Sequence, residues 1–118
     1  MADAAPDLDT VRAFNDVINA RDLGALTALM TDDHRFVDSE GATVDGKAAC
    51  TEAWRGFFAA FPDYRNVFTE VTSDDAGEVQ VLGHSTCSVP ELSGPARWRA
   101  LVTDGRVALW QVSEVDQA

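Results

Sequence analysis

The chain has few of the residues that hold together secreted or metal-containing domains. Among 118 residues it contains two cysteines, Cys50 and Cys87, and two histidines, His34 and His84. Two cysteines are too few for a disulfide framework, and their spacing from the histidines is not that of a zinc site. The chain also lacks a glycine-rich loop for phosphate and a dinucleotide-binding fingerprint. We therefore expect packed, reduced thiols, no metal and no cofactor.

Basic residues are also scarce, with nine Lys and Arg against twenty Asp and Glu and a formal net charge of -11 at pH 7. The resulting field repels phosphate backbones and anionic lipid surfaces, so we expect neither nucleic acid nor a membrane as partner. No apolar run is long enough to span a membrane, and the acidic first residues do not resemble a signal peptide. These absences predict a cytoplasmic protein, and the even composition predicts that residues 1–118 form a single domain.

The first half of the chain has the periodicity of helices. Apolar residues at helical spacing predict a helix over about residues 8–20, with Asp7 or Asp9 as its N-cap. A second short helix is expected to open at Asp22, to pack as an antiparallel hairpin against the first, and to end at 31–33. The residues of the first apolar stripe are Leu8, Val11, Phe14 and Ile18.

A short strand over residues 34–38 and a small hairpin up to Gly46 are expected to precede a third helix over 47–60. Asp45 suits the cap of that helix, and Pro62 ends it. Its aromatic residues share one face that must be buried. They are Trp54, Phe57, Phe58 and Phe61.

Four strands are expected to fill the second half, at about 65–73, 78–88, 96–103 and 106–115. The pair Asp104-Gly105 between the last two is typical of a tight hairpin turn, in which both central residues have positive φ. Helices followed by an antiparallel meander predict an α+β fold in which the helices cover one face of a twisted sheet.

Four features of the chain occur together in one known superfamily. They are the Asp32-Asp33 pair, the acidic strand that closes in Gly41, the Phe-Phe-Ala-Ala-Phe-Pro-Asp-Tyr run over 57–64, and the terminal Gly-Arg-Val-Ala-Leu-Trp-Gln strand over 105–111. With the order of elements, they resemble the nuclear-transport-factor-2-like superfamily over about residues 8–115. Within it the chain is most similar to SnoaL-like proteins, relatives of polyketide cyclases and ketosteroid isomerases.

This resemblance implies a cone-shaped, curved antiparallel sheet wrapped around helices, with an apolar pocket for a hydrophobic small molecule. It also implies a homodimer that pairs through the outer face of the sheet. The superfamily includes isomerases, cyclases, dehydratases, epoxide hydrolases and binding modules, so the fold does not decide the function.

Asp38 is the candidate general base, because it falls where the resemblance places the proton-shuttling Asp of ketosteroid isomerases. A carboxylate desolvated in an apolar pocket has a raised pKa and can both take and return a proton near neutrality. Enolisation or an intramolecular aldol closure would use such a group. The alternative is that Asp38 only caps the turn formed by residues 39–41.

The other groups of the isomerase site are not found. Its oxyanion-binding Tyr corresponds to Phe14, and its protonated acid falls near Trp98 or Arg99, so steroid isomerisation is not expected. Tyr64, which we expect near the pocket mouth, and His84 are the candidate donors. A bulge at Gly83 would change the side to which His84 points, which leaves its facing open.

The expected pocket wall is mainly aromatic. Its candidate ligand-binding residues are Phe14, His34, Phe36, Trp54, Phe58, Trp98 and Trp110, with ordinary core packing as the alternative for each aromatic residue. We thus expect an acid/base isomerase or cyclase that acts on a hydrophobic carbonyl compound, or a non-catalytic ligand-binding module. A hydrolase or dehydratase that uses a pocket water is a third alternative, for which a second charged partner is not found.

Overall fold

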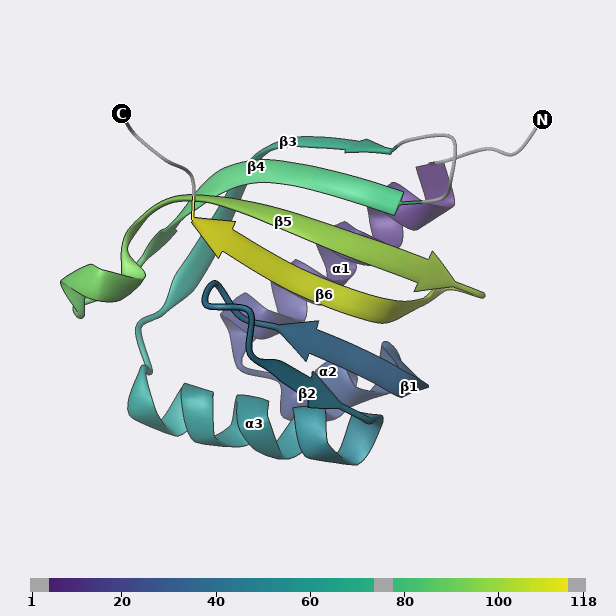
Figure 1. Ribbon diagram of the computed structural model, residues 1–118, viewed down its shortest axis with the longest axis horizontal. Coiled ribbons are helices and arrows are strands. Elements are labelled where there is room, and N and C mark those ends of the chain that lie inside the picture. Colours follow the sequence, from purple (N-terminus) through teal and green to yellow (C-terminus); the bar gives the residue numbers. More distant parts are fainter. Residues whose placement is uncertain (1–4, 74–77, 115–118) are drawn as a thin grey trace.

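A strongly curved sheet encloses the first helix of the chain (Figure 1). The computed structural model describes residues 5–73 and 78–114. The helices are α1 (Ala5–Ala20), α2 (Leu23–Ala28), α3 (Lys47–Ala60) and the short 3₁₀ helix η1 (Pro90–Leu92). The strands are β1 (Met30–Val37), β2 (Thr43–Asp45), β3 (Arg65–Ser73), β4 (Glu78–Thr86), β5 (Gly94–Thr103) and β6 (Arg106–Glu114).

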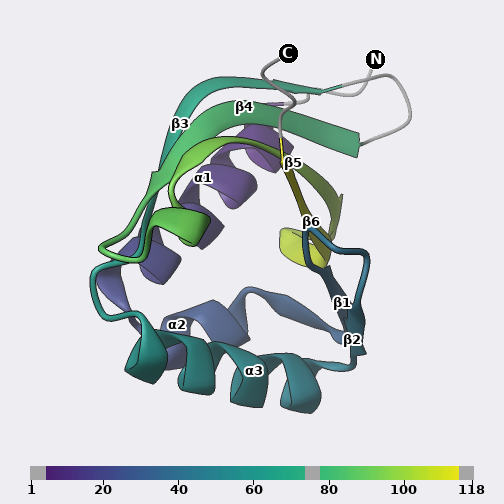
Figure 2. The same cartoon turned by 60° about the vertical axis from the view of Figure 1, so that its left-hand side comes forward.

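The strands form one six-stranded sheet in the order β2-β1-β6-β5-β4-β3. Strands β3 to β6 arch over α1, while α3 lies across the open side of the arch with α2 beside it (Figure 2). The predicted α+β fold with a curved sheet around helices is therefore confirmed. None of the helices in the described ranges is long and apolar enough to cross a membrane.

One strand pair departs from the expected antiparallel pattern. Strand β1 runs parallel to β6, with Met30 opposite Val107 and Phe36 opposite Trp110, so the sheet is mixed. The expected helix end at residues 31–33 is wrong, because α2 already ends at Ala28 and β1 begins at Met30. The register with β6 shifts between Met30 and Arg35, so this acidic stretch joins the sheet irregularly.

The prediction that the second helix opens at Asp22 is confirmed, whereas the predicted cap at Asp45 is wrong. Asp22 caps α2, accepting a hydrogen bond from the Ala25 N–H at 3.1 Å. Asp45 does not cap α3: it lies in β2 and pairs with Arg35, and Gly46 occupies the N-cap with φ of 97°. A cross-strand cation outcompetes the helix end for this carboxylate, since the two residues are directly opposite in the β1–β2 register.

Two other turn predictions have different outcomes. The Asp104-Gly105 turn has φ of 52° and 76°, and joins β5 to β6 as predicted. Helix α1 begins at Ala5, so Asp7 lies in its first turn and Asp9 further along, and neither is the N-cap. Asp7 still lies at the end of the helix where negative charge is favourable.

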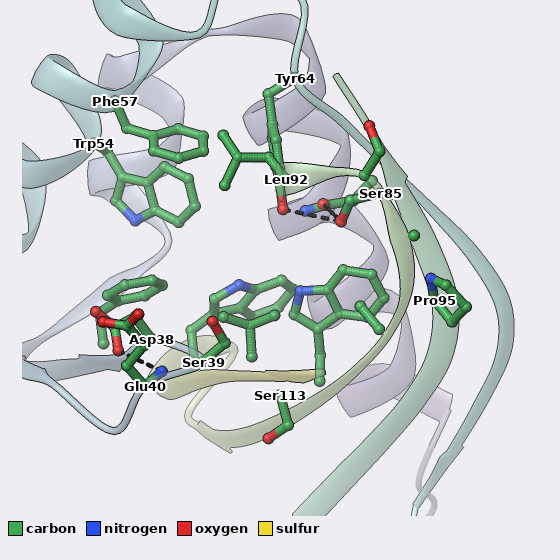
Figure 3. A pocket seen from close by; sticks show the side chains of 18 of the residues that line it. Asp38, Ser39, Glu40, Trp54, Phe57, Tyr64, Ser85, Leu92, Pro95 and Ser113 are labelled. Atoms are coloured by element: carbon green, nitrogen blue, oxygen red, sulfur yellow. Dashed lines mark hydrogen bonds between the residues drawn. The ribbon is translucent and has the colours of Figure 1, made fainter. Parts of the chain in front are cut away.

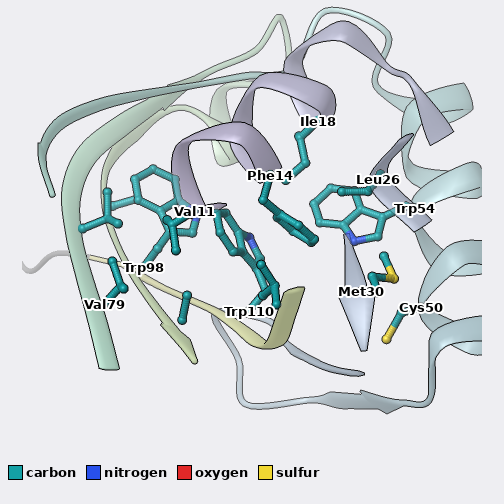
Figure 4. Packing of buried hydrophobic residues seen from close by; sticks show 14 residues of the cluster. Val11, Phe14, Ile18, Leu26, Met30, Cys50, Trp54, Val79, Trp98 and Trp110 are labelled. Atoms are coloured by element: carbon teal, nitrogen blue, oxygen red, sulfur yellow. The ribbon is translucent and has the colours of Figure 1, made fainter. Parts of the chain in front are cut away.

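The core combines aliphatic side chains with four large aromatic ones, Phe14, Trp54, Trp98 and Trp110 (Figure 4). Trp98 and Trp110 are each only 1% exposed, and the Phe14 and Trp110 ring centroids lie 4.6 Å apart. Burying a large apolar side chain stabilises a fold by about 1.5–3 kcal/mol. Both cysteines are free thiols, with Cys50 buried on α3 and Cys87 half-buried after β4.

Candidate functional site

A cavity of about 680 Å³ lies between α3, the end of β1, and strands β3 to β6. Most of its wall is apolar. Its aromatic residues are Phe36, Trp54, Phe57, Tyr64, Trp98 and Trp110. A cavity of this size and character fits a small hydrophobic molecule with several rings.

Asp38 lies at the mouth of this cavity, directly after β1, and is half-buried. Its Oδ1 accepts hydrogen bonds from the N–H groups of Glu40 and Ala42, both at 2.9 Å. Gly41, with φ of 86°, closes the turn by donating its N–H to the Asp38 carbonyl at 3.0 Å. Asp38 therefore does cap its turn, and the same carboxylate also lines the cavity. Within the described ranges, Oδ2 accepts no hydrogen bond.

Tyr64, Asn66 and Ser85 form a second polar group on the inner wall, which we call the inner polar cluster. Figure 3 shows Tyr64 and Ser85 of this cluster side by side. The Ser85 hydroxyl donates to Asn66 Oδ1 at 3.0 Å, and the Tyr64 hydroxyl lies 3.0 Å from Ser85 Oγ. A serine hydroxyl has a single hydrogen, so Tyr64 is the donor in the second of these bonds. Asn66 and Ser85 are 2% and 5% exposed, which places this chain of hydrogen bonds away from bulk water.

Hydrogen bonds with α1 fix the backbone of Asn66 in the inner polar cluster. The Asn66 backbone N–H donates to Asn19 Oδ1, and Asn19 Nδ2 donates to the Asn66 carbonyl, each at 2.9 Å. Asn15 Nδ2 reaches the same carbonyl at 3.4 Å. These contacts leave Asn66 Nδ2 buried and without a hydrogen-bond partner among the described residues. Asn66 lines the cavity, but this amide nitrogen is itself covered, so a ligand oxygen reaches it only when the side chain turns.

Burial raises the pKa of Tyr64, the hydrogen bond with Ser85 opposes this shift, and the nearby Cys87 adds to it. The phenol is therefore protonated at neutral pH and serves as a donor rather than as a base.

Trp54 supplies another unused donor. Its side chain is 7% exposed, and its Nε1 is buried with no partner in the described part of the chain. The ring packs edge-on against Phe36 and Phe57, with centroids 5.5 and 5.6 Å away. In Figure 3 its nitrogen lies on the ring edge directed toward the side of the cavity that holds Asp38 and Glu40.

Six of the residues predicted from the sequence line this cavity: Phe36, Asp38, Trp54, Tyr64, Trp98 and Trp110. Phe14 and His34 do not, because both are fully buried beneath it. The His34 ring lies 5.6 Å from that of Phe14, and its Nδ1 bonds to the Val107 carbonyl at 2.6 Å. Burial lowers the pKa of His34, so the ring is neutral and Nδ1 is its donor.

Phe58 also lies outside the cavity wall. Its ring packs against Trp54 at 5.6 Å, and the Arg21 guanidinium lies 5.9 Å from its centroid. Phe57, one residue earlier and about 100° around the helix, lines the cavity instead.

His84 does not line the cavity, whereas its neighbour Ser85 does, because successive strand residues face opposite sides of a sheet. The suspected bulge is in β3, where the register shifts between Phe68 and Glu70, and not at Gly83. Gly83 is needed for close approach of the strands: a Cβ there would lie 2.1 Å from the Val67 carbonyl oxygen.

Sequence reasoning missed Asn66, Ser85, Glu40 and Phe57. Asn66 had a usable signal, since it has the same strand parity as Tyr64 two residues earlier. The contact between Asn66 and Ser85 had none, because it depends on the pairing of β3 with β4. Within residues 5–73 and 78–114 no three His, Cys, Asp or Glu side chains are grouped so as to hold a metal ion.

A curved sheet around α1, with an apolar cavity at its open side, matches the nuclear-transport-factor-2-like fold of solved structures. The model of the SnoaL-like domain matches residues 11–115, and the chain belongs to this family. The resemblance inferred from the sequence is thereby confirmed. No curated protein matches the chain significantly.

Solved structures agree with this fold. A candidate polyketide cyclase from Sinorhizobium meliloti has a TM-score of 0.80 and 24% identity, over 89% of this chain and 94% of its own. A candidate ketosteroid isomerase from Kribbella flavida has a TM-score of 0.79 and 17% identity, over 96% and 80%. An epoxide hydrolase of the LEH-like type from M. tuberculosis has a TM-score of 0.79 and 16% identity, over 92% and 81%. At these identities the likeness extends to the fold and not to the reaction.

Proposed function

We propose that the protein binds a hydrophobic carbonyl compound in the cavity and moves a proton on it, as a cofactor-independent isomerase or cyclase. One observation carries this proposal: a single aromatic cavity has a carboxylate, Asp38, at its mouth and buried hydrogen-bond donors on its inner wall. Proton transfer next to a carbonyl needs both, a base for the carbon and donors for the oxygen that becomes negative.

Asp38 Oδ2 is the atom that takes the proton, because Oδ1 is held by the backbone of its own turn. The bond from carbon to hydrogen breaks, its electron pair forms the enolate, and the negative charge moves to the carbonyl oxygen. In an isomerisation, Asp38 then returns the proton to a different carbon. In a cyclisation, the enolate carbon attacks a second carbonyl carbon, and Asp38 gives its proton to the alkoxide oxygen that forms there.

Asn66 Nδ2 is the donor best placed to stabilise the enolate once its side chain turns toward the cavity, since no described residue bonds to it. Tyr64 can join it by turning its hydroxyl hydrogen away from Ser85. His84 has no place in this scheme, because it does not line the cavity. Phe14 occupies the position of the isomerase Tyr but is buried under Trp110, so steroid isomerisation is not part of the proposal.

The decisive test is Asp38→Asn, with hydrogen–deuterium exchange of cyclic ketones in D₂O followed by NMR. Asn retains an Oδ1 acceptor for the two turn N–H groups, so the fold is kept while the base is lost. We expect the exchange rate to fall by about a hundredfold or more. Asp16→Asn, a loss of the same charge from an exposed position on α1, should not alter it. Full exchange by Asp38→Asn would refute a role as base.

A second candidate is a ligand-binding module without chemistry, favoured by the turn-capping role of Asp38, which needs no reaction. Its ligand affinity would hardly depend on Asp38 and would fall in Trp98→Ala and Trp110→Ala. Both tryptophans are core residues, so Phe57→Ala, a half-buried part of the wall, provides a milder change.

We propose that the protein is a homodimer in the cytoplasm, a proposal that rests on its resemblance to SnoaL-like proteins. Leu82, 37% exposed, lies on the outer face of the sheet beside Arg97 and Gln80, where a partner would bind. Light scattering of Leu82→Glu against the unchanged chain tests the assembly: a monomer in both, or a dimer in both, would contradict this surface.

A further inference from the structure

The charges around the cavity are of one sign. Asp38 and Glu40 are the only ionisable acids or bases, apart from the neutral Tyr64, among the described residues that line it, and no Arg, Lys or His does so. The nearest basic residue along β1, Arg35, is paired with Asp45. Neither Asp38 nor Glu40 forms an ion pair within the described ranges, so the mouth has negative charge without a counterion.

Aromatic rings lie next to this charge. Phe36 precedes Asp38 by two residues, and its ring meets Trp54 edge-on at 5.5 Å within the cavity wall. The face of an aromatic ring attracts a cation within about 6 Å of its centroid. Carboxylates and ring faces together are the surroundings that an ammonium group prefers and a carboxylate avoids.

The deeper wall has the opposite preference. Asn66 Nδ2 is a buried donor without a partner among the described residues, in a side chain that is 2% exposed. It gains a hydrogen bond only if the ligand has an acceptor, such as a carbonyl or hydroxyl oxygen. The cavity thus distinguishes an inner end for ligand oxygen from a mouth for positive charge.

We propose that the ligand is an aromatic or polycyclic carbonyl compound that also carries a protonated amine, and that Glu40 is the residue that selects for the charge. Glu40 is exposed, and its side chain has no role in the turn, so its carboxylate is free to face an ammonium at the mouth. Asp38 keeps its role toward the carbon. This inference rests on the proposed function only in taking the cavity as the ligand site.

Three fluorescent probes with the same ring system and different charge test the proposal: aminomethylanthracene, hydroxymethylanthracene and anthracene carboxylate. Their dissociation constants are measured at pH 7 with the unchanged protein, with Glu40→Gln and with Glu52→Gln. Glu52 is exposed on α3, paired with Arg55 and outside the cavity wall, so its variant loses the same charge elsewhere.

We expect the amine to bind about threefold tighter than the alcohol and about tenfold tighter than the carboxylate, an advantage that falls as salt is added. Glu40→Gln should bring the amine and the alcohol to about equal affinity, and Glu52→Gln should change neither ratio. Equal binding of the amine and the alcohol to the unchanged protein would overturn the proposal, and so would a preference that survives Glu40→Gln.

Failure of this inference can be told from failure of the proposed function. Loss of charge preference with continued ketone exchange would reject the amine and keep the reaction. A charge preference without ketone exchange would keep the amine and favour the binding module. No binding of any probe would remove the cavity as the ligand site, and both proposals with it.

Discussion

The mouth of the cavity and its inner wall are both polar, but they are built in opposite ways. At the mouth, Asp38 is satisfied by residues two and four positions later in its own turn. On the inner wall, Ser85 and Asn66 come from different strands, 19 positions apart, and Asn66 is held by α1 from 47 positions away. The turn is formed by hydrogen bonds within residues 38–42, whereas the inner polar cluster depends on the whole fold. The turn leaves an acceptor, Asp38 Oδ2, without a hydrogen bond, and the cluster leaves a donor, Asn66 Nδ2, without a partner among the described residues. The mouth and the inner wall therefore differ in the kind of hydrogen-bonding group that they leave unused.

Of the variants that test this difference between the mouth and the inner wall, Ser85→Ala is expected to lose the most stability. It removes both hydrogen bonds at the centre of the inner polar cluster and leaves the Asn66 amide oxygen buried and unpaired. We expect the free energy of unfolding to fall by about 2–3 kcal/mol, measured by urea denaturation. Thr86→Ala, an exposed neighbour on the same strand, should fall within about 0.5 kcal/mol of the unchanged chain. Similar losses in both variants would mean that the cluster is not sealed from water.

The buried His34 is expected to make the free energy of unfolding depend on pH. Burial lowers its pKa, so the unfolded chain binds a proton near pH 6.5 while the folded chain resists it. The free energy of unfolding is therefore expected to decline as pH falls below about 6.5, by up to about 1.4 kcal/mol per pH unit until the folded ring titrates.

The check is a series of urea titrations from pH 7.5 to about 5, compared between His34→Asn and His84→Asn. The first variant should flatten the decline and the second should leave it. A slope that His34→Asn does not change would assign the acid sensitivity to carboxylates instead.

Asp38→Ala examines the local turn. Two turn N–H groups lose their acceptor but can reach water, so we expect a loss of about 1 kcal/mol, less than for Ser85→Ala. Asp38→Asn should lose less than Asp38→Ala in the same denaturation experiment. Equal losses would show that Oδ1 does not hold the turn.

The smallest effect is expected for Tyr64→Phe. The phenol lies at the end of the hydrogen-bond chain, and Ser85 keeps its bond to Asn66 without it. We expect a loss of about 0.5–1 kcal/mol. A loss as large as that for Ser85→Ala would place Tyr64 at the centre of the cluster instead.

The features that could be predicted from the sequence are those that depend on residues close together in the chain. The helical stripe around Phe14, the cap at Asp22 and the turn at Asp104-Gly105 depend on spacing and on side chains a few positions apart, and they are confirmed. Asp38 could be placed at a turn for the same reason. The role of Asp45 could not be predicted in this way, because its partner Arg35 lies on another strand.

The candidate site could be predicted only in part. Trp98 and Trp110 line the cavity as predicted, and Trp98 stands between Arg97 and Arg99, so strand alternation indicates its facing. The facing of His84 stays open in the sequence, because the position of the bulge depends on how β3 pairs with β4, and the close approach of the two strands at Gly83 is likewise a property of both. The sequence also cannot predict that Asn66 Nδ2 and Trp54 Nε1 have no hydrogen-bond partner among the described residues. That absence depends on every residue that packs around the two side chains.

The parallel pairing of β1 with β6 has a consequence for how the chain is made. Met30 is synthesised 77 residues before its strand partner Val107, and Phe14 still longer before Trp110 covers it. While the ribosome works through β3 to β5, β1 has an open edge and α1 has an uncovered aromatic side. Contacts over such long separations form late and leave the growing chain prone to aggregation. Strand β6 therefore completes both the sheet and the cavity, and the cavity cannot form before β6 has been synthesised.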